Sequence, residues 1–411
     1  MTKNFLHAFP QPDDLLKWHK EKKFPPARET NAHIHTPASF SAFGSIEQIF
    51  VIAAKEGIEV LGINDFYTAD GYEPFHDLAV KQKIFPLFSI EFIGLLREEQ
   101  QTGIRVNDPE NPGRTYLCGK GLDYPFHLPG PFSVMLEKVK EESQRQIRQM
   151  IEKLNVHASS AGLDMVWDYD TIRSAFAEKL VRERHLARAV RSAVWKTAAT
   201  PGEQRTLLQR LFSGVDPKAN VNSAAAVENE IRSRLLKAGG PAFVEEDPEA
   251  FLEIGQVKSI IHAAGGLPCY PVLLDNRQGE MTAFEQDWPA LMDKLRNLGI
   301  GLVEMIPLRN DAAVLERFVR LFHRNNFVVT FGTEHNTPDL IPLTIRSRDG
   351  NVLDDDLRHI GYEGACVVAA HQYCRARGMK GYTGEDGQPR MEQKQAFAEL
   401  GRAVIDRFFT Q

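Results

Sequence analysis

The sequence predicts an α/β protein whose parallel strands carry their functional groups at one end. Two observations lead to this fold class. The opening 65 residues follow the order strand, helix, strand, which implies a parallel pair of strands joined by a helix. Further along the chain, apolar segments of strand length repeatedly contain or precede a titratable side chain. Because the carboxyl ends of parallel strands converge on one face, we expect a site on that face.

The composition is that of an ordinary soluble globular protein, with 411 residues, 43% of them hydrophobic and 25% charged. This length suggests two or three units, or a single α/β barrel with an insertion. The formal net charge of -6 argues against a dedicated nucleic-acid-binding protein. The four scattered cysteines predict neither structural disulfides nor a zinc ribbon. A cytoplasmic protein without membrane contact is expected, since the sequence shows no secretion signal and no run of 18 apolar residues.

The first elements can be placed from their boundary residues. Residues 1–28 are expected to form a short helix and a linker that leads into the first strand. Ser45 and Gln48 have the spacing of a capping box at the start of a helix, and Gly57 stands where the C-cap of that helix is expected. A short apolar strand over residues 58–63 follows.

The remaining strands are expected where apolar runs recur, at 84–90, 266–274, 299–305 and 327–331. Strand signals nearly vanish between residues 130 and 248, where apolar side chains recur at helical spacing instead. We therefore expect a helical insertion over 130–248. It would divide a barrel into a first part, 29–129, and a second part with C-terminal helices, 249–411.

The first predicted strand ends in a His-x-His pair, His33 and His35. Side chains at positions i and i+2 of a strand point to the same face, so both imidazoles can aim at one metal ion. Taken alone, such a pair is more often a buried, hydrogen-bonded structural feature than a metal site. The residues that accompany it elsewhere in the chain therefore carry the argument.

Six short motifs accompany one another along the chain: His33-Ile34-His35-Thr36, Gly62-Ile63-Asn64-Asp65, Glu91, Arg184-His185-Leu186-Ala187, Ala264-Gly265-Gly266 and Gly332-Thr333-Glu334. In order and spacing this set resembles the PHP (polymerase and histidinol phosphatase) superfamily, and most closely its subgroup with a helical insertion. The resemblance covers about residues 30–340. It implies a distorted seven-stranded (β/α) barrel of PHP type with a mainly helical insertion. It also implies binding of up to three divalent metals and hydrolysis of phosphate esters.

The chain departs from the family at five positions where a metal-site side chain is expected. The residues found there are Phe40, Phe66, Tyr116, Tyr270 and Asn336. Phenylalanine cannot coordinate a metal at all. A full site with three metals is therefore not expected.

The resemblance leaves one coherent set of ligands. His33, His35, Glu91 and Glu334 correspond to residues that surround one metal in the family, and His185 is available beside them. Two imidazoles and two carboxylates suit Zn²⁺, Mn²⁺ or Fe²⁺ and leave room for water. We expect one divalent metal, with two as the alternative.

Further roles are expected around this set. Asp65 or His335 would act as the general base, and His335 would be a ligand in place of Glu334 if the register differs by one. Three side chains would orient the substrate: Arg184, Tyr270 and Asn336. Each has a plainer structural role as its alternative. Arg184 belongs to an arginine-rich helical face, and Tyr270 could fill the space left by the family's histidine.

The sequence therefore predicts a metal-dependent hydrolase with a reduced, mononuclear site that acts on a phosphorylated small molecule through a metal-activated water. A hydrolase of esters, amides or lactones is an alternative, because in-line phosphoryl displacement is usually the task of a metal pair. A degenerate PHP domain that binds a ligand or partner without turnover is another. Nucleic acid is a less favoured substrate, and the sequence sets no oligomeric state.

Overall fold

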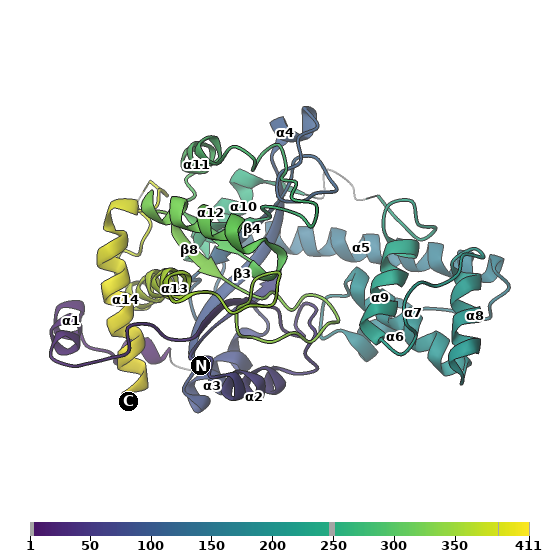
Figure 1. The fold of residues 1–411 in the computed structure, drawn as a ribbon, viewed down its shortest axis with the longest axis horizontal. Helices are drawn as coiled ribbons and strands as arrows, with labels where there is room; N and C mark the ends of the chain where they lie inside the picture. Colours follow the sequence, from purple (N-terminus) through teal and green to yellow (C-terminus); the bar gives the residue numbers. More distant parts are fainter. Residues whose placement is uncertain (1–3, 246–250, 385, 411) are drawn as a thin grey trace.

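The computed structural model describes residues 4–245, 251–384 and 386–410, and it confirms the predicted α/β fold class. Seven strands follow one another in the order β1-β2-β3-β4-β6-β7-β8, and the short β5 pairs with β3 beside this path. Figure 1 shows these strands at the centre of the molecule with helices around them. Their bounds are Thr30–Ile34 (β1), Val60–Phe66 (β2), Phe85–Leu95 (β3), Arg114–Lys120 (β4), Leu252–Glu253 (β5), Leu267–Val272 (β6), Leu302–Met305 (β7) and Val328–Phe331 (β8).

The sheet is a nearly closed, distorted barrel. Consecutive strands are parallel except β4, which runs antiparallel to both β3 and β6. Strand β4 was not predicted from the sequence. Its reversed direction is the main distortion of the barrel. The barrel closes where Ile34 forms a parallel bridge with Glu334, just past the end of β8. The amide of His35 donates to the carbonyl of Glu334 at 2.7 Å across this seam.

Helices surround the barrel and form a separate group to one side (Figure 1). Those in the barrel part are α1 (Pro12–Lys20), α2 (Ile46–Glu56), α3 (Tyr72–Gln82), α4 (Arg97–Gln101), α10 (Ile254–Ala263), α11 (Trp288–Asn297), α12 (Ala312–Arg324), α13 (Asp355–Ala376) and α14 (Lys394–Phe409). Those of the side group are α5 (Gly130–Ser160), α6 (Tyr169–Phe176), α7 (Glu183–Thr197), α8 (Pro201–Leu211) and α9 (Ala224–Ile231). None of the helices in the described ranges is long and apolar enough to cross a membrane.

The start and end of α2 show how local sequence sets these boundaries. The Ser45 hydroxyl accepts a hydrogen bond from the amide of Gln48, and Gly57 ends the helix in a left-handed conformation with φ of 70°. Both features were predicted. The Gln48 side chain reaches the amide of Gly44 instead of that of Ser45, so the capping box is only half formed.

The barrel interior has two layers. Near the start of the strands lie apolar side chains such as Val60, Phe85 and Leu302, which share one buried cluster with α13 and α14. These two helices therefore close that end of the barrel with apolar packing. Towards the carboxyl ends of the strands the inward side chains become polar, as at Asn64 and Glu304, although they stay fully buried.

The long helix α5 connects the side group to the barrel. Its first turns contribute Leu136 and Val139 to the apolar cluster of the barrel, whereas its later turns contribute Ile147 and Leu154 to a second cluster. That second cluster is built from α5 to α9. The side group thus has its own apolar core, and the proposed domain division at residues 130 and 248 stays a prediction.

Candidate metal centre

Three inward-facing side chains meet at the carboxyl end of the barrel. His33 lies on β1, His35 follows directly after that strand, and Glu91 lies on β3. Gly332, after β8, makes room for the first of these, because a Cβ at residue 332 would lie 2.3 Å from Cβ of His33. The potential ligand atoms of His33, His35 and Glu91 all lie within 4.8 Å of one another. Three of the five predicted ligands are therefore brought together.

The spacing of this cluster fits one metal ion. The Nε2 atoms of His33 and His35 are 3.2 Å apart, and Nε2 of His35 is 3.5 Å from Oε2 of Glu91. Two imidazole nitrogens bound tetrahedrally at about 2.0–2.1 Å would be about 3.3 Å apart. In addition, Oδ1 of Asn64 and Oγ of Ser89 on adjacent strands are buried without hydrogen-bond partners in the described residues. Such orphaned atoms are expected beside a bound ion and its water.

Both imidazoles are held through Nδ1, and their Nε2 atoms point into the cluster, where that of His33 also lies 3.0 Å from the amide nitrogen of Asn64. Nδ1 of His33 lies 2.6 Å from Oε2 of Glu304, and Nδ1 of His35 lies 3.2 Å from the hydroxyl of Ser39. That hydroxyl in turn donates to Asp65 at 2.7 Å. Carboxylate and hydroxyl groups of this kind orient metal-binding histidines in known sites.

The electrostatics favour a cation in the cluster. Burial raises the pKa of Glu91 well above its usual 4.5, and the nearby carboxylates of Glu334 and Glu304 raise it further. Burial also lowers the pKa of His35 well below 6.5, and His33 lowers it further. A divalent cation adds the largest stabilisation where an imidazole such as that of His35 is neutral and carboxylates are crowded together.

The other two predicted ligands lie outside the cluster. Glu334 is buried nearby, but its carboxylate forms an ion pair with Arg309. His185 accepts a hydrogen bond at Nδ1 from the amide of Arg182 at 2.9 Å and packs edge-on against Phe40. Burial lowers the pKa of His185 to about 3, so it is a neutral, packed side chain at the start of α7.

The two predicted general bases are engaged by the protein itself. Asp65 accepts hydrogen bonds from the amide and hydroxyl of Thr36 and from Ser39, at 2.6 to 2.7 Å. Burial raises the pKa of Asp65 to about 7, against the lowering effect of these donors. His335 contacts the hydroxyl of Thr333 through Nδ1 and the carbonyl of Ile341 through Nε2, both at 2.8 Å. These contacts make Asp65 an organiser of the loop after β1 and leave neither His335 nitrogen free.

The three predicted substrate-orienting side chains are not gathered in one place. Arg184 donates to Asn229 on α9 at 3.2 Å. Tyr270 is fully buried and its hydroxyl donates to Glu285 at 2.8 Å. Asn336 is half-buried after β8.

Sequence reasoning missed the polar layer directly beneath the cluster. A second group that could hold a metal consists of His33, Cys118 and Glu304. Glu304 also forms a buried ion pair with Lys120 on the unpredicted strand β4. Lys120 and His33 lower the pKa of Glu304 to about 2, although its burial acts in the opposite direction. A charged residue inside an apolar strand sequence, Leu117-Cys118-Gly119-Lys120, was the signal available.

A cleft of about 1390 Å³ opens between the barrel and the side group. Its lining includes Phe66, Tyr67 and Arg182, and Phe66 is paired with Glu91 across β2 and β3. The guanidinium of Arg182 stacks 3.7 Å from the centre of the Phe66 ring and makes no ion pair with a described residue. Its charge is near enough to lower the pKa of His35. The cleft therefore ends next to the metal cluster.

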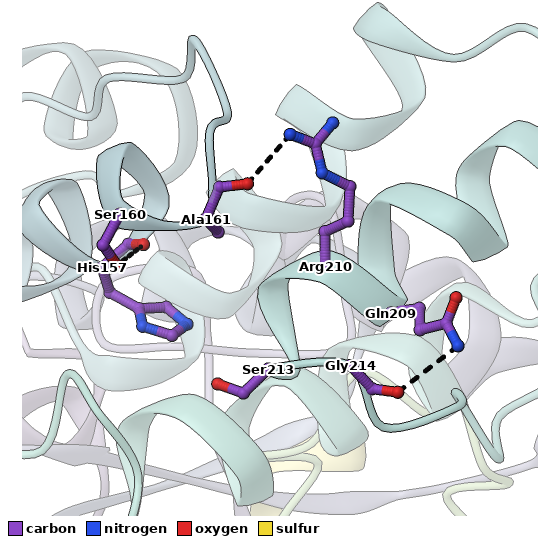
Figure 2. A pocket seen from close by; sticks show the side chains of 7 residues that line it. All are labelled: His157, Ser160, Ala161, Gln209, Arg210, Ser213 and Gly214. Carbon is purple, nitrogen blue, oxygen red and sulfur yellow. Dashed lines mark hydrogen bonds between the residues drawn. The ribbon is translucent and has the colours of Figure 1, made fainter.

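A smaller pocket of about 330 Å³ lies in the side group, far along the chain from the cluster. Figure 2 shows that several of its polar side chains bond to backbone carbonyls. Arg210 donates to the carbonyl of Ala161 at 2.9 Å, and Gln209 donates to that of Gly214 at 3.3 Å. His157, also in the lining, contacts the carbonyl of Leu211 at 2.7 Å. The bonds of His157 and Arg210 join α5 and its C-terminal turn to α8, and that of Gln209 stabilises the turn after α8.

Comparison with known proteins gives a fold but no family. No family model matches the chain, and no curated protein sequence matches it. A Bifidobacterium adolescentis protein provisionally described as a metal-dependent phosphoesterase is similar in structure, with a TM-score of 0.55 and 17% sequence identity over 82% of this chain and 96% of that one. An amidohydrolase from Chromobacterium violaceum, with bound sulfate and no metal, gives a TM-score of 0.49 and 15% identity over 80% of this chain and 96% of that one. The first similarity shows a shared fold, and the second is too low to carry an argument.

Proposed function

We propose that this protein is a metal-dependent hydrolase with a mononuclear centre at His33, His35 and Glu91. The observation that carries the proposal is the pair of Nε2 atoms 3.2 Å apart, with the Glu91 carboxylate 3.5 Å from His35. The ligand atoms of these three side chains converge on one buried point, where a divalent cation would stabilise all of them together. The resemblance to the PHP superfamily supports the same assignment.

Within this proposal each side chain has a defined task. A bound Zn²⁺, Mn²⁺ or Fe²⁺ would lower the pKa of a water and polarise the oxygen under attack. Ser39 and Glu304 hold the two imidazoles in place, and Asp65 holds Ser39. Glu334 is buried within electrostatic reach of Glu91, and its ion pair with Arg309 keeps its carboxylate at the rim of the cluster.

We propose a phosphorylated small molecule as the substrate, bound in the adjoining cleft. The guanidinium of Arg182, which has no carboxylate partner among the described residues, suits the planar, two-point recognition of a phosphate. The aromatic rings of Phe66 and Tyr67 at the same end of the cleft would contact the rest of the molecule. A single metal is also compatible with hydrolysis of an amide or lactone, which is the second candidate activity.

The test is metal content together with activity. Protein purified without chelator or nickel is examined by plasma mass spectrometry beside a His33→Ala/His35→Ala variant. We expect about one equivalent of metal in the wild type and none in the variant. Hydrolysis is then assayed with p-nitrophenyl phosphate, followed by lactones and amides. Failure of the wild type to bind Zn²⁺ or Mn²⁺ even after incubation would leave a PHP-like binding protein without turnover.

A further inference from the structure

The interior of the barrel holds a charged pair directly beneath the metal cluster. Lys120 is 1% exposed, and its ammonium group contacts Glu304 and, at 3.1 Å, the carbonyl of Ala32. We propose that Lys120 and Glu304 act as a fixed pair that orients His33 for the first metal and keeps a second metal out of the inner group. This inference rests on the proposed function, because it concerns the same metal centre.

Both carboxylate oxygens of Glu304 are already bound within the protein. Its Oε1 faces the Lys120 ammonium and, at 3.3 Å, the hydroxyl of Thr330. Its Oε2 faces Nδ1 of His33 at 2.6 Å and the thiol of Cys118 at 3.7 Å. A carboxylate with four such neighbours is held in one orientation and cannot turn to become a ligand.

The second step concerns the proton on His33. A carboxylate can only accept, so the bond to Glu304 requires the proton of His33 to sit on Nδ1. Nε2 of His33 then carries a lone pair, 3.2 Å from Nε2 of His35 and 3.0 Å from the amide nitrogen of Asn64, and a metal that displaces the amide can bind it. Lys120 enforces this arrangement, because its ammonium can only donate and therefore keeps an acceptor oxygen of residue 304 turned towards itself.

The third step concerns the inner group of His33, Cys118 and Glu304. These residues have the composition and spacing of a metal site, yet Lys120 already places a positive charge on the carboxylate of that group. A divalent cation there would lie beside an ammonium group in a buried environment, which is strongly unfavourable. This pair would therefore restrict the centre to one metal, although the described residues contain two candidate groups.

Two variants of the cluster and a matched control distinguish a positioning role of Lys120 and Glu304 from a purely structural one. In Glu304→Gln, Lys120 would hold the amide oxygen and the amide nitrogen would face Nδ1 of His33, which forces the proton to Nε2. In Lys120→Met/Glu304→Gln the amide can turn, and both tautomers are expected. The matched control is Lys394→Met/Glu363→Gln, which removes another ion pair, 3.1 Å apart, between a buried lysine and a half-buried glutamate away from the cluster.

Two measurements are made on each folded variant. The tautomer of His33 in metal-free protein is read from nitrogen chemical shifts of ¹⁵N-labelled histidine, and Zn²⁺ affinity is read from competition with a chelating dye. We expect wild type and control to be alike, the double variant at Lys120 and Glu304 to bind Zn²⁺ about 10- to 100-fold more weakly, and Glu304→Gln to be weaker still. Equal affinity and an unchanged Nδ1–H tautomer in the cluster variants would overturn the proposal.

A third measurement addresses the second metal. Cd²⁺ bound to a thiolate absorbs in the near ultraviolet, so it reports on Cys118. We expect one equivalent of Cd²⁺ without this band in the wild type, and a second equivalent with the band in Lys120→Met. A thiolate band in the wild type would overturn the exclusion of the inner group. If the wild type binds no metal but its His33 has the Nδ1–H tautomer, the proposed function is overturned and the positioning of His33 is not.

Discussion

Two histidine-containing regions of this molecule, a pocket in the side group and the buried cluster of the barrel, differ in how their polar groups are used. In the pocket of Figure 2, His157, Arg210 and Gln209 each bond to a backbone carbonyl of a neighbouring helix or turn. At the end of the barrel, two imidazoles instead present their Nε2 atoms to each other, beside the Glu91 carboxylate. The first contacts are all made within the protein, whereas beside the second set Oδ1 of Asn64 and Oγ of Ser89 have no hydrogen-bond partners in the described residues.

The comparison teaches that unsatisfied polar geometry, and not the presence of a cavity, distinguishes the candidate site. The pocket in the side group is an open hollow whose polar groups stabilise helix packing. The barrel cluster is almost fully buried, with His33 at 0% exposure and Glu91 at 5%. Beside the cluster, Oδ1 of Asn64 and Oγ of Ser89 are buried without hydrogen-bond partners in the described residues, and because such burial is costly these atoms indicate a ligand.

The largest expected difference between the two regions is in metal affinity. His35→Ala removes one imidazole of the cluster and should weaken Zn²⁺ binding by more than about 100-fold, since even supporting residues of metal sites contribute 10- to 100-fold. His157→Ala, the matched change in the other hollow, should leave the affinity unchanged. Isothermal titration of both variants measures the effect. Similar affinities for the two would remove the distinction drawn between the hollows.

The pH dependence of metal binding should sharpen the comparison further. The metal needs Glu91 as a carboxylate, whereas burial and the neighbouring carboxylates raise the pKa of Glu91 well above 4.5 in the metal-free protein. Below that raised pKa, binding displaces a proton, so the affinity should fall about tenfold for each unit that the pH decreases. Titrations at several pH values test this slope. Glu91→Gln should bind weakly at every pH, with a flatter dependence.

The stability of the metal-free protein should depend on Asp65. Its pKa of about 7 lies above the unfolded value of 3.8, so the folded state holds the proton more tightly. The resulting stabilisation is complete below pH of about 4 and is lost as the pH rises through about 7, at up to about 1.4 kcal/mol per pH unit. Urea denaturation between pH 4 and 8 should show this loss in the wild type and a reduced one in Asp65→Asn. Parallel curves for the two proteins would contradict the assignment.

The smallest effect is expected in the pocket of Figure 2. Arg210→Ala removes an exposed side chain that donates to the carbonyls of Ala161 and Gly162. The free energy of unfolding should fall by about 1 kcal/mol or less, and metal affinity and hydrolysis should stay unchanged. Thermal denaturation beside a metal titration checks both statements. A change in hydrolysis would show that the two regions are functionally connected.

The sequence contained enough local information for much of the fold. Alternation and capping residues placed β1, α2 and β2, because those signals act over a few neighbouring residues. Strand β4 was not predicted, because its polarity pattern is irregular and because its antiparallel pairing with β3 and β6 is not visible in local sequence. Lys120 points into the barrel, whereas a lysine is expected at the surface when burial is judged from residue type alone.

For the candidate site, the sequence indicated which residues take part more readily than it indicated where their side chains point. Strand geometry indicated that His33 and His35 share a face, and the resemblance to the PHP superfamily added Glu91 to them. Glu334 and His335 lie past the end of β8 in left-handed conformations, with φ of 61° and 58°, and no periodicity predicts where such residues point. Glu304 was visible on its strand, but its role depends on Lys120, which is a contact between distant segments.

The seam of the barrel also has a consequence for biosynthesis. The strand that carries His33 is joined to the segment after β8 by the bond from Asn31 to Thr333, which connects residues 302 positions apart. Because synthesis proceeds from the N-terminus, both histidines leave the ribosome long before Glu304 and the closing segment exist. Contacts of such long range form late, so a nascent chain would hold its histidines without the partner that orients them. Metal loading is then an event of the finished chain, and ribosome-bound chains that end before residue 300 should bind Zn²⁺ no better than the unfolded protein does.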